Sequence, residues 1–116
     1  MKTHKDLDVW QKSIQFVTDI YNVTKEFPDE EKYCLVNQIR RSAVSIPSNI
    51  AEGSARQTKK EFIQFLYISL GSAAELNTQL MISENLDFIK DSKNLLTNLE
   101  DIQKMLMGLI KYLKND

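Results

Sequence analysis

Apolar residues recur at steps of three and four along most of the chain, and this spacing predicts four amphipathic helices. We expect them over about residues 7–27, 29–51, 58–86 and from 91 or 92 onwards, with Asp6 capping the first helix and Phe27-Pro28 ending it. The inward-facing stripes are expected to be Leu7, Trp10, Ile14, Val17 and Tyr21; Leu35, Ile39, Ser42, Ile46 and Ile50; Phe62, Leu66, Ser69, Ala73, Leu76 and Leu80; and Leu95, Leu99, Ile102, Leu106, Leu109 and Leu113.

The connections between these helices are short, at about residues 28–31, 53–57 and 87–90. Short connections make sequential helices antiparallel neighbours. The 116 residues suit one domain. The sequence therefore predicts an all-α fold, an antiparallel up-down-up-down four-helix bundle in which residues 1–116 form a single domain.

Several positions have a specific expected role within this bundle. Pro47 lies inside the second helix and should bend it, because proline removes one backbone hydrogen bond and clashes with the carbonyl of Ala43. Gly53 is placed to end that helix. The spacing of Thr58 and Glu61 predicts a capping box at the start of the third helix. Gly71 predicts close packing, either within the bundle or between subunits.

Apolar residues exceed what one inward stripe per helix needs. The surplus consists of Val9, Phe16, Ile20, Tyr67 and Leu70. Because exposed apolar surface of this kind marks interaction sites, we expect a homo-oligomer.

The charge is balanced overall and clustered locally. Lysine plus arginine total 15 against 16 acidic residues, unlike a strongly basic nucleic-acid binder. Between residues 40 and 61, however, five cations face only two carboxylates, and the cations are Arg40, Arg41, Arg56, Lys59 and Lys60. Two interpretations stay open: a surface that binds phosphates, or a solvated surface with internal salt bridges.

Catalytic and metal-binding chemistry finds little support in the sequence. His4 is the only histidine and Cys34 the only cysteine, too few for a zinc site or a disulfide. We expect Cys34 to be a core or interface residue, and Glu75 to form a buried ion pair with Arg40 or Arg41. No cofactor, small-molecule substrate or membrane span is predicted. The polar N-terminus and the lone thiol favour a cytoplasmic protein.

One stretch of the second predicted helix has a distinctive sequence, Arg40-Arg41-Ser42-Ala43-Val44-Ser45-Ile46-Pro47-Ser48-Asn49-Ile50-Ala51-Glu52-Gly53. It resembles the signature of the 23S rRNA intervening-sequence protein family. The likeness covers roughly residues 7–90, including Leu7-Asp8-Val9-Trp10-Gln11-Lys12 and Gly71-Ser72-Ala73-Ala74-Glu75-Leu76. The family consists of bacterial four-helix bundles, often encoded within insertions in ribosomal RNA genes. Within the motif, Pro47, Asn49, Glu52 and Gly53 are expected to form the kink and the turn.

This resemblance implies a homo-oligomeric ring, expected to be a pentamer, and no known catalytic activity. A related branch, the accessory variability determinant proteins of diversity-generating retroelements, binds a reverse transcriptase and nucleic acid through basic surfaces. The first hypothesis is therefore a non-enzymatic oligomer associated with RNA or with a nucleic-acid-processing partner such as a reverse transcriptase. The second is a protein–protein scaffold or adaptor with no nucleic-acid contact.

Overall fold

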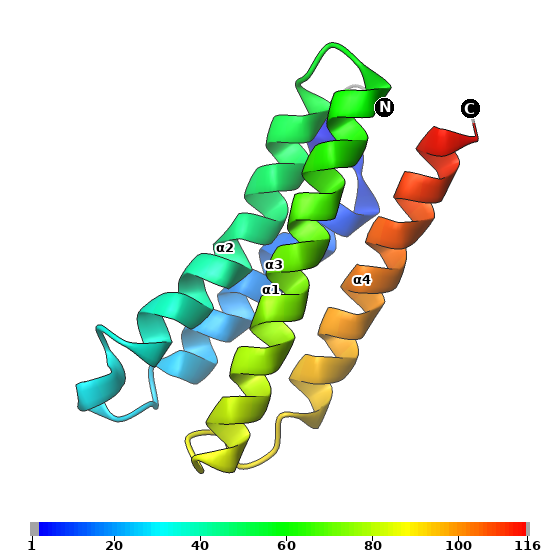
Figure 1. Ribbon diagram of the computed structural model, residues 1–116. Coiled ribbons are helices and arrows are strands. Elements are labelled where there is room, and N and C mark those ends of the chain that lie inside the picture. Colours follow the sequence, from blue (N-terminus) through cyan, green and yellow to red (C-terminus); the bar gives the residue numbers. More distant parts are fainter. Residues whose placement is uncertain (1–2, 116) are drawn as a thin grey trace.

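Four long helices form the molecule in a computed structural model that describes residues 3–115 (Figure 1). They are α1 (Asp8–Thr24), α2 (Leu35–Ser54), α3 (Lys59–Asn85) and α4 (Lys93–Lys114), with short 3-10 helices η1 (His4–Asp6) and η2 (Asp29–Glu31) before α1 and α2. Figure 1 shows that successive helices run in opposite directions along a body 46 Å long. The predicted all-α bundle is confirmed, and residues 3–115 contain no strand.

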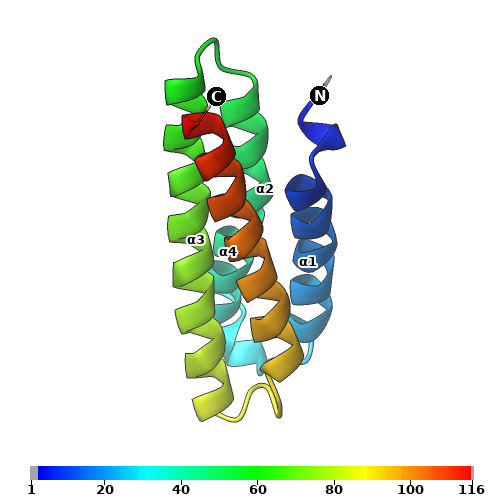
Figure 2. The same ribbon diagram turned by 90° about the vertical axis from the view of Figure 1, so that its right-hand side faces the viewer.

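Each helix packs against its two neighbours around the bundle (Figure 2). The contact between α2 and α3 is the most extensive, and the contact that closes the bundle, between α1 and α4, is much smaller. Packing defects between α2 and α3 are therefore expected to affect stability most.

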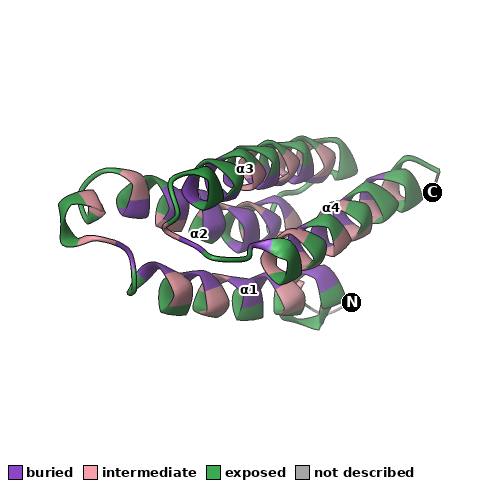
Figure 3. Cartoon of the chain, turned by 90° about the horizontal axis from the view of Figure 1, so that it is seen from below, coloured by how far each residue is buried: buried purple, intermediate pink, exposed green. Residues whose placement is uncertain are grey.

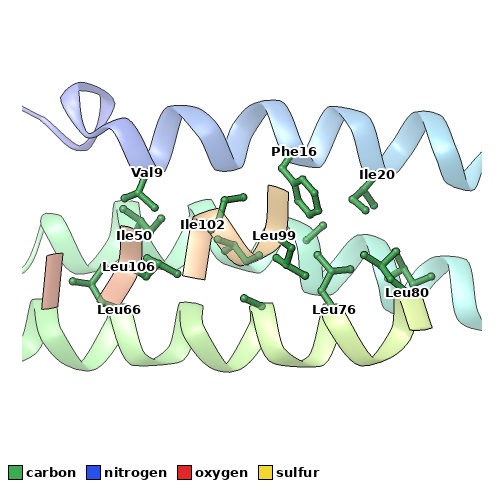
Figure 4. Close-up of a cluster of buried hydrophobic side chains, with 14 of the residues drawn as sticks. Val9, Phe16, Ile20, Ile50, Leu66, Leu76, Leu80, Leu99, Ile102 and Leu106 are labelled. Atoms are coloured by element: carbon green, nitrogen blue, oxygen red, sulfur yellow. The ribbon is translucent and has the colours of Figure 1, made fainter. Parts of the chain in front are cut away.

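Buried residues form one apolar core along the inner faces of the helices (Figure 3). In α3 all six predicted inward positions, from Phe62 to Leu80, are buried. Figure 4 shows Leu66 and Leu76 of α3 pointing toward Leu99, Ile102 and Leu106 of α4 and the side chains of α1. The predicted stripes of α2 and α4 also face the core, where Leu35, Leu95, Leu109 and Leu113 are only partly buried.

The predicted stripe of α1 was right only in part, since Leu7, Trp10 and Val17 are half-buried and pack against the core. Ile14 and Tyr21 are exposed, and the buried residues are instead Val9, Ser13, Phe16, Ile20 and Thr24. Both sets follow helical spacing, so the pattern alone could not tell which one faces the bundle. The two buried hydroxyls are accommodated because each donates to a carbonyl of its own helix, from Ser13 to Trp10 at 2.8 Å and from Thr24 to Ile20 at 2.8 Å.

The ends of two helices also differ from the prediction. Residue Leu7, not Asp6, occupies the position before α1, and Asp6 instead accepts the Thr3 backbone N–H in a capping box of η1. Helix α2 begins only at Leu35, after η2. Cys34 is exposed in this connection rather than part of the core.

Gly53 brings α2 and α3 into close contact instead of ending the helix. Helix α2 continues to Ser54, and Gly53 is buried without a left-handed backbone conformation. A Cβ on Gly53 would lie 2.6 Å from the Cβ of Phe65 and 3.0 Å from Cδ1 of Phe62. Only glycine permits this approach, because real Cβ contacts are essentially never that short.

Gly71 does not serve close packing within the bundle. It is exposed, and a Cβ added there would meet nothing within 4 Å; the same holds for Gly108. The first half of the prediction for Gly71 is therefore wrong, and the role between subunits stays a prediction.

Candidate nucleic-acid interface

The turn between α2 and α3 presents three of the predicted cations to solvent. Arg56, Lys59 and Lys60 are exposed, as expected from their place ahead of the first core residue of α3. The Thr58 hydroxyl accepts from the Glu61 backbone N–H at 3.1 Å and donates to the Glu61 carboxylate at 2.9 Å. This cap fixes the direction in which the chain enters α3.

Two contacts hold the Arg56 guanidinium. It pairs with the Glu52 carboxylate at 2.9 Å and lies over the ring of Phe65, 4.8 Å from the ring centre. Both members of the ion pair are about half exposed, so water screens it and it contributes little stability. Glu52, a residue of the family-like motif, thus offsets part of the charge of this turn.

Two further lysines lie at the same end of the bundle. Lys111 and Lys114, in the last turn of α4, are exposed, and Figure 1 shows the end of α4 at the same end of the bundle as the α2–α3 turn. Lys114 donates to the Tyr67 hydroxyl at 2.8 Å. Sequence reasoning missed both lysines because they follow the turn by some fifty residues.

Arg40 does not belong to this surface. Its Nε donates to Thr24 Oγ1 at 2.9 Å, its Nη2 donates to the Tyr21 carbonyl at 3.3 Å, and its guanidinium lies 4.4 Å from the centre of the Tyr21 ring. The expected pairing with Glu75 was wrong, because the end of α1 offers Arg40 two acceptors and an aromatic face. Arg40 therefore links α2 to α1 through hydrogen bonds and a contact with an aromatic ring.

Arg41 is exposed but distant from the turn. Fifteen residues of mostly helical chain separate it from Arg56, which corresponds to roughly 20 Å along α2. The five predicted cations therefore do not form one patch. Arg41 instead lines a polar cavity of about 330 Å³ between α2 and α3, together with Asn37, Gln38, Ser42, Ser45, Ser72, Glu75 and Gln79.

Glu75 is exposed in this cavity, so the predicted buried ion pair was wrong. Its Oε1 accepts a hydrogen bond from the Ser42 hydroxyl at 2.7 Å. Nearby Gln79 is buried, and its Oε1 has no hydrogen-bond partner among the described residues. Leaving a buried acceptor unpaired costs about 1–3 kcal/mol of folding stability.

Small polar side chains close the rest of the α2–α3 contact. The hydroxyls of Ser45 and Ser72 lie 2.8 Å apart, and the Asn49 amide donates to the Ser45 carbonyl at 2.8 Å and to its hydroxyl at 2.9 Å. Ser69 donates to the Ile46 carbonyl at 3.0 Å. Pro47 lies between these positions in the sequence and is buried inside an uninterrupted helix. The bend expected at Pro47 stays a prediction.

Catalytic pairing of Cys34 with His4 is excluded by the fold. Cys34 precedes α2, whereas His4 precedes α1 at the other end of the bundle and packs edge-on against Trp10, with ring centres 5.0 Å apart. Residues 3–115 contain no group of three or more His, Cys, Asp or Glu that could hold a metal ion. None of the described helices is long and apolar enough to span a membrane.

Comparison with known proteins gives a family and a structural relative. The family model described as 23S rRNA-intervening sequence protein matches residues 5–108. A crystal structure from Bacteroides thetaiotaomicron, of a protein of unknown function from the S23 ribosomal protein family, is similar with a TM-score of 0.82. The two chains are 31% identical, over 89% of this chain and 95% of the other. No protein of curated function matches the sequence.

Proposed function

Since the chain belongs to the 23S rRNA-intervening sequence protein family, we propose that it is a non-enzymatic, cytoplasmic homo-oligomer that associates with RNA or with a nucleic-acid-processing partner. The observation that supports this proposal is the exposed group of Arg56, Lys59 and Lys60 at the α2–α3 turn. Lysine and arginine side chains on such a turn can neutralise backbone phosphates and release their counterions.

One subunit alone would bind weakly. The turn combines its three cations with the carboxylates of Glu52 and Glu61, which leaves one net positive charge. A homo-oligomeric ring, expected to be a pentamer, repeats the turn once per subunit. Individually weak phosphate contacts then add through effective concentration.

Exposed apolar residues on the outer faces of α3 and α4 support self-association. Tyr67, Ile68, Met107 and Tyr112 are all exposed, and Met107 is 61% accessible. Tyr67 and Met107 also line an apolar cavity of about 500 Å³ between these helices. Exposed apolar residues that gather around a cavity are typical of interaction sites.

A protein–protein scaffold without nucleic-acid contact is the alternative. The balanced net charge and the Glu52–Arg56 ion pair favour it. The two functions differ in their dependence on salt, because counterion release occurs only on binding to a polyanion.

Fluorescence anisotropy with a labelled, structured RNA tests the proposal. We expect binding at low salt that weakens steeply as salt rises. The triple variant Arg56→Glu, Lys59→Glu and Lys60→Glu should lose it and keep the helical circular dichroism signal, since exposed substitutions cost little stability.

The matched control reverses Lys25, Lys32 and Lys90, three exposed lysines near the opposite end of the bundle, with the same change in charge. This control should still bind. If the wild type does not bind RNA or DNA at low salt, or if both triple variants bind RNA as tightly as the wild type does, the scaffold function replaces the proposed one.

A further inference from the structure

The cavity between α2 and α3 is lined by polar and charged side chains, and we propose that it binds a guanine base of single-stranded RNA. This inference rests on the proposed association with RNA and adds a preference for one base. It concerns residues that lie roughly 20 Å along α3 from the basic turn, so the two can be tested separately.

The α3 wall of the cavity offers hydrogen-bond acceptors. Glu75 uses Oε1 to accept from Ser42 at 2.7 Å, which fixes the carboxylate and leaves most of its acceptor capacity unused. Gln79 follows four residues later on the same side of the helix. Its side chain lines the cavity, the residue is 7% exposed, and Oε1 has no hydrogen-bond partner among the described residues. That oxygen is itself buried, so the acceptor that a ligand can reach on this wall is the exposed Glu75 carboxylate. A ligand must therefore bring N–H or O–H donors to Glu75.

The α2 wall offers a donor. The exposed Arg41 guanidinium makes no hydrogen bond or ion pair with any residue in the described part of the chain. The charges of Glu75 and Arg41 balance within the lining. The cavity therefore favours an uncharged group that donates on one edge and accepts on the other.

Guanine fits this arrangement among the four RNA bases. Its N1–H and N2–H groups are adjacent donors that a carboxylate can accept together, and its O6 and N7 are the acceptor pair that arginine recognises. Adenine, cytosine and uracil each place an acceptor beside the donor on that edge, which would face the Glu75 carboxylate unfavourably. About 330 Å³ is room for one unstacked base, which is how proteins read single-stranded RNA.

Titration of the whole protein with free nucleotides, followed by calorimetry and by backbone amide NMR shifts, tests the inference. We expect 5′-GMP to bind tighter than AMP, CMP and UMP and to shift the amides of Ser42, Ser72 and Glu75. Inosine monophosphate, which lacks only the N2 amino group, should bind about tenfold more weakly, the order expected for losing one specific base contact. This comparison requires no mutation.

Glu75→Gln should remove the preference for GMP over inosine monophosphate, while its amide oxygen can still accept from Ser42. Glu100→Gln changes an exposed carboxylate on α4, outside the cavity, and should preserve the preference. Equal binding of all four nucleotides, absence of shifts along α2 and α3, or an unchanged preference in Glu75→Gln would each overturn the inference.

Failure of this inference is distinguishable from failure of the proposed function. RNA binding that depends on the basic turn but shows no preference for guanine would overturn the base pocket alone. If the protein binds GMP but does not bind RNA, the result would support a guanine site in the cavity and contradict the proposed association with RNA.

Discussion

Gly53 of α2 and Phe65 of α3 approach so closely that a Cβ on Gly53 would lie 2.6 Å from the Cβ of Phe65. The contact lies next to the α2–α3 turn, where the exposed cations gather. The absence of a side chain at residue 53 therefore permits the close approach of the two helices next to the proposed interface.

Gly53→Ala should destabilise the protein in spite of the better helix propensity of alanine. The added methyl group meets a Cβ and the Phe62 carbonyl, which cannot move without the helix, so overpacking should cost about 1–3 kcal/mol. Urea unfolding followed by circular dichroism measures the change. A stability equal to or above that of the wild type would contradict the packing argument.

Gly71→Ala is the matched opposite case. Gly71 is exposed inside α3 with open space around its Cβ position, so alanine should stabilise the isolated chain by about 1 kcal/mol. If Gly71 lies between subunits, the same variant should weaken assembly in light scattering while the helix becomes more stable. Greater stability with unchanged assembly would exclude Gly71 from the subunit contact.

The two glycines also show how far the sequence could predict the fold. The period of the apolar residues identified four helices and, in α3, six inward positions from Phe62 to Leu80, but it missed the buried Gln79. It could not rank the two stripes of α1, since both are helical and the choice depends on what α2 and α4 present to them. Nor could it tell the buried Gly53 from the exposed Gly71, because the space around a glycine depends on the neighbouring helix.

The candidate site was predictable to a similar degree. Exposure of Arg56, Lys59 and Lys60 followed from their place in a turn. The partners of Arg40 did not, because Thr24 lies sixteen residues away on another helix. A signal for the polar cavity was present in the sequence. Ser72, Glu75 and Gln79 recur at steps of three and four on a mostly apolar helix, which is typical of a polar stripe.

Met107→Lys should disrupt the oligomer. Met107 is 61% exposed and lines the apolar cavity between α3 and α4, so a lysine there would place a charge in the proposed subunit contact. We expect the wild type to be a defined oligomer at micromolar concentration in light scattering, and the variant to be smaller. Met81→Lys, at a methionine that is 53% exposed and lies outside that cavity, is the control and should assemble normally. A monomeric wild type would refute self-association altogether.

Pro47→Ala should straighten α2, because it restores a backbone N–H for the Ala43 carbonyl and removes the clash of the ring. Pro47 also lines the surface groove that contains Trp10, Ile14 and Val44, so a change in the path of α2 alters that groove. We expect a higher helical signal and impaired assembly. If both the crystal structure and the oligomeric state of the variant equal those of the wild type, the proline has no shaping role.

The last prediction concerns the carboxylate of Glu84, near the end of α3. Its Oε1 accepts from the Ser92 backbone N–H at 2.9 Å and from the Ser92 hydroxyl at 2.8 Å, and so links the end of α3 to the start of α4. The backbone hydrogen bond first, and the hydroxyl second, hold the pKa of Glu84 below its ordinary value, because both stabilise the charged form.

A group whose pKa is lower in the folded state stabilises the fold above its unfolded pKa, which for glutamate is about 4.3. That contribution is lost as the pH falls through the lower, folded pKa. Glu84→Gln should therefore reduce the loss of stability between neutral pH and about pH 3. Urea unfolding midpoints at each pH measure this loss. Glu100→Gln, on the exposed face of α4, should leave the loss of stability unchanged. The two variants are matched in charge, so a difference between their pH profiles reports the link between Glu84 and Ser92. Identical profiles would mean that this link contributes nothing to the acid sensitivity of the fold.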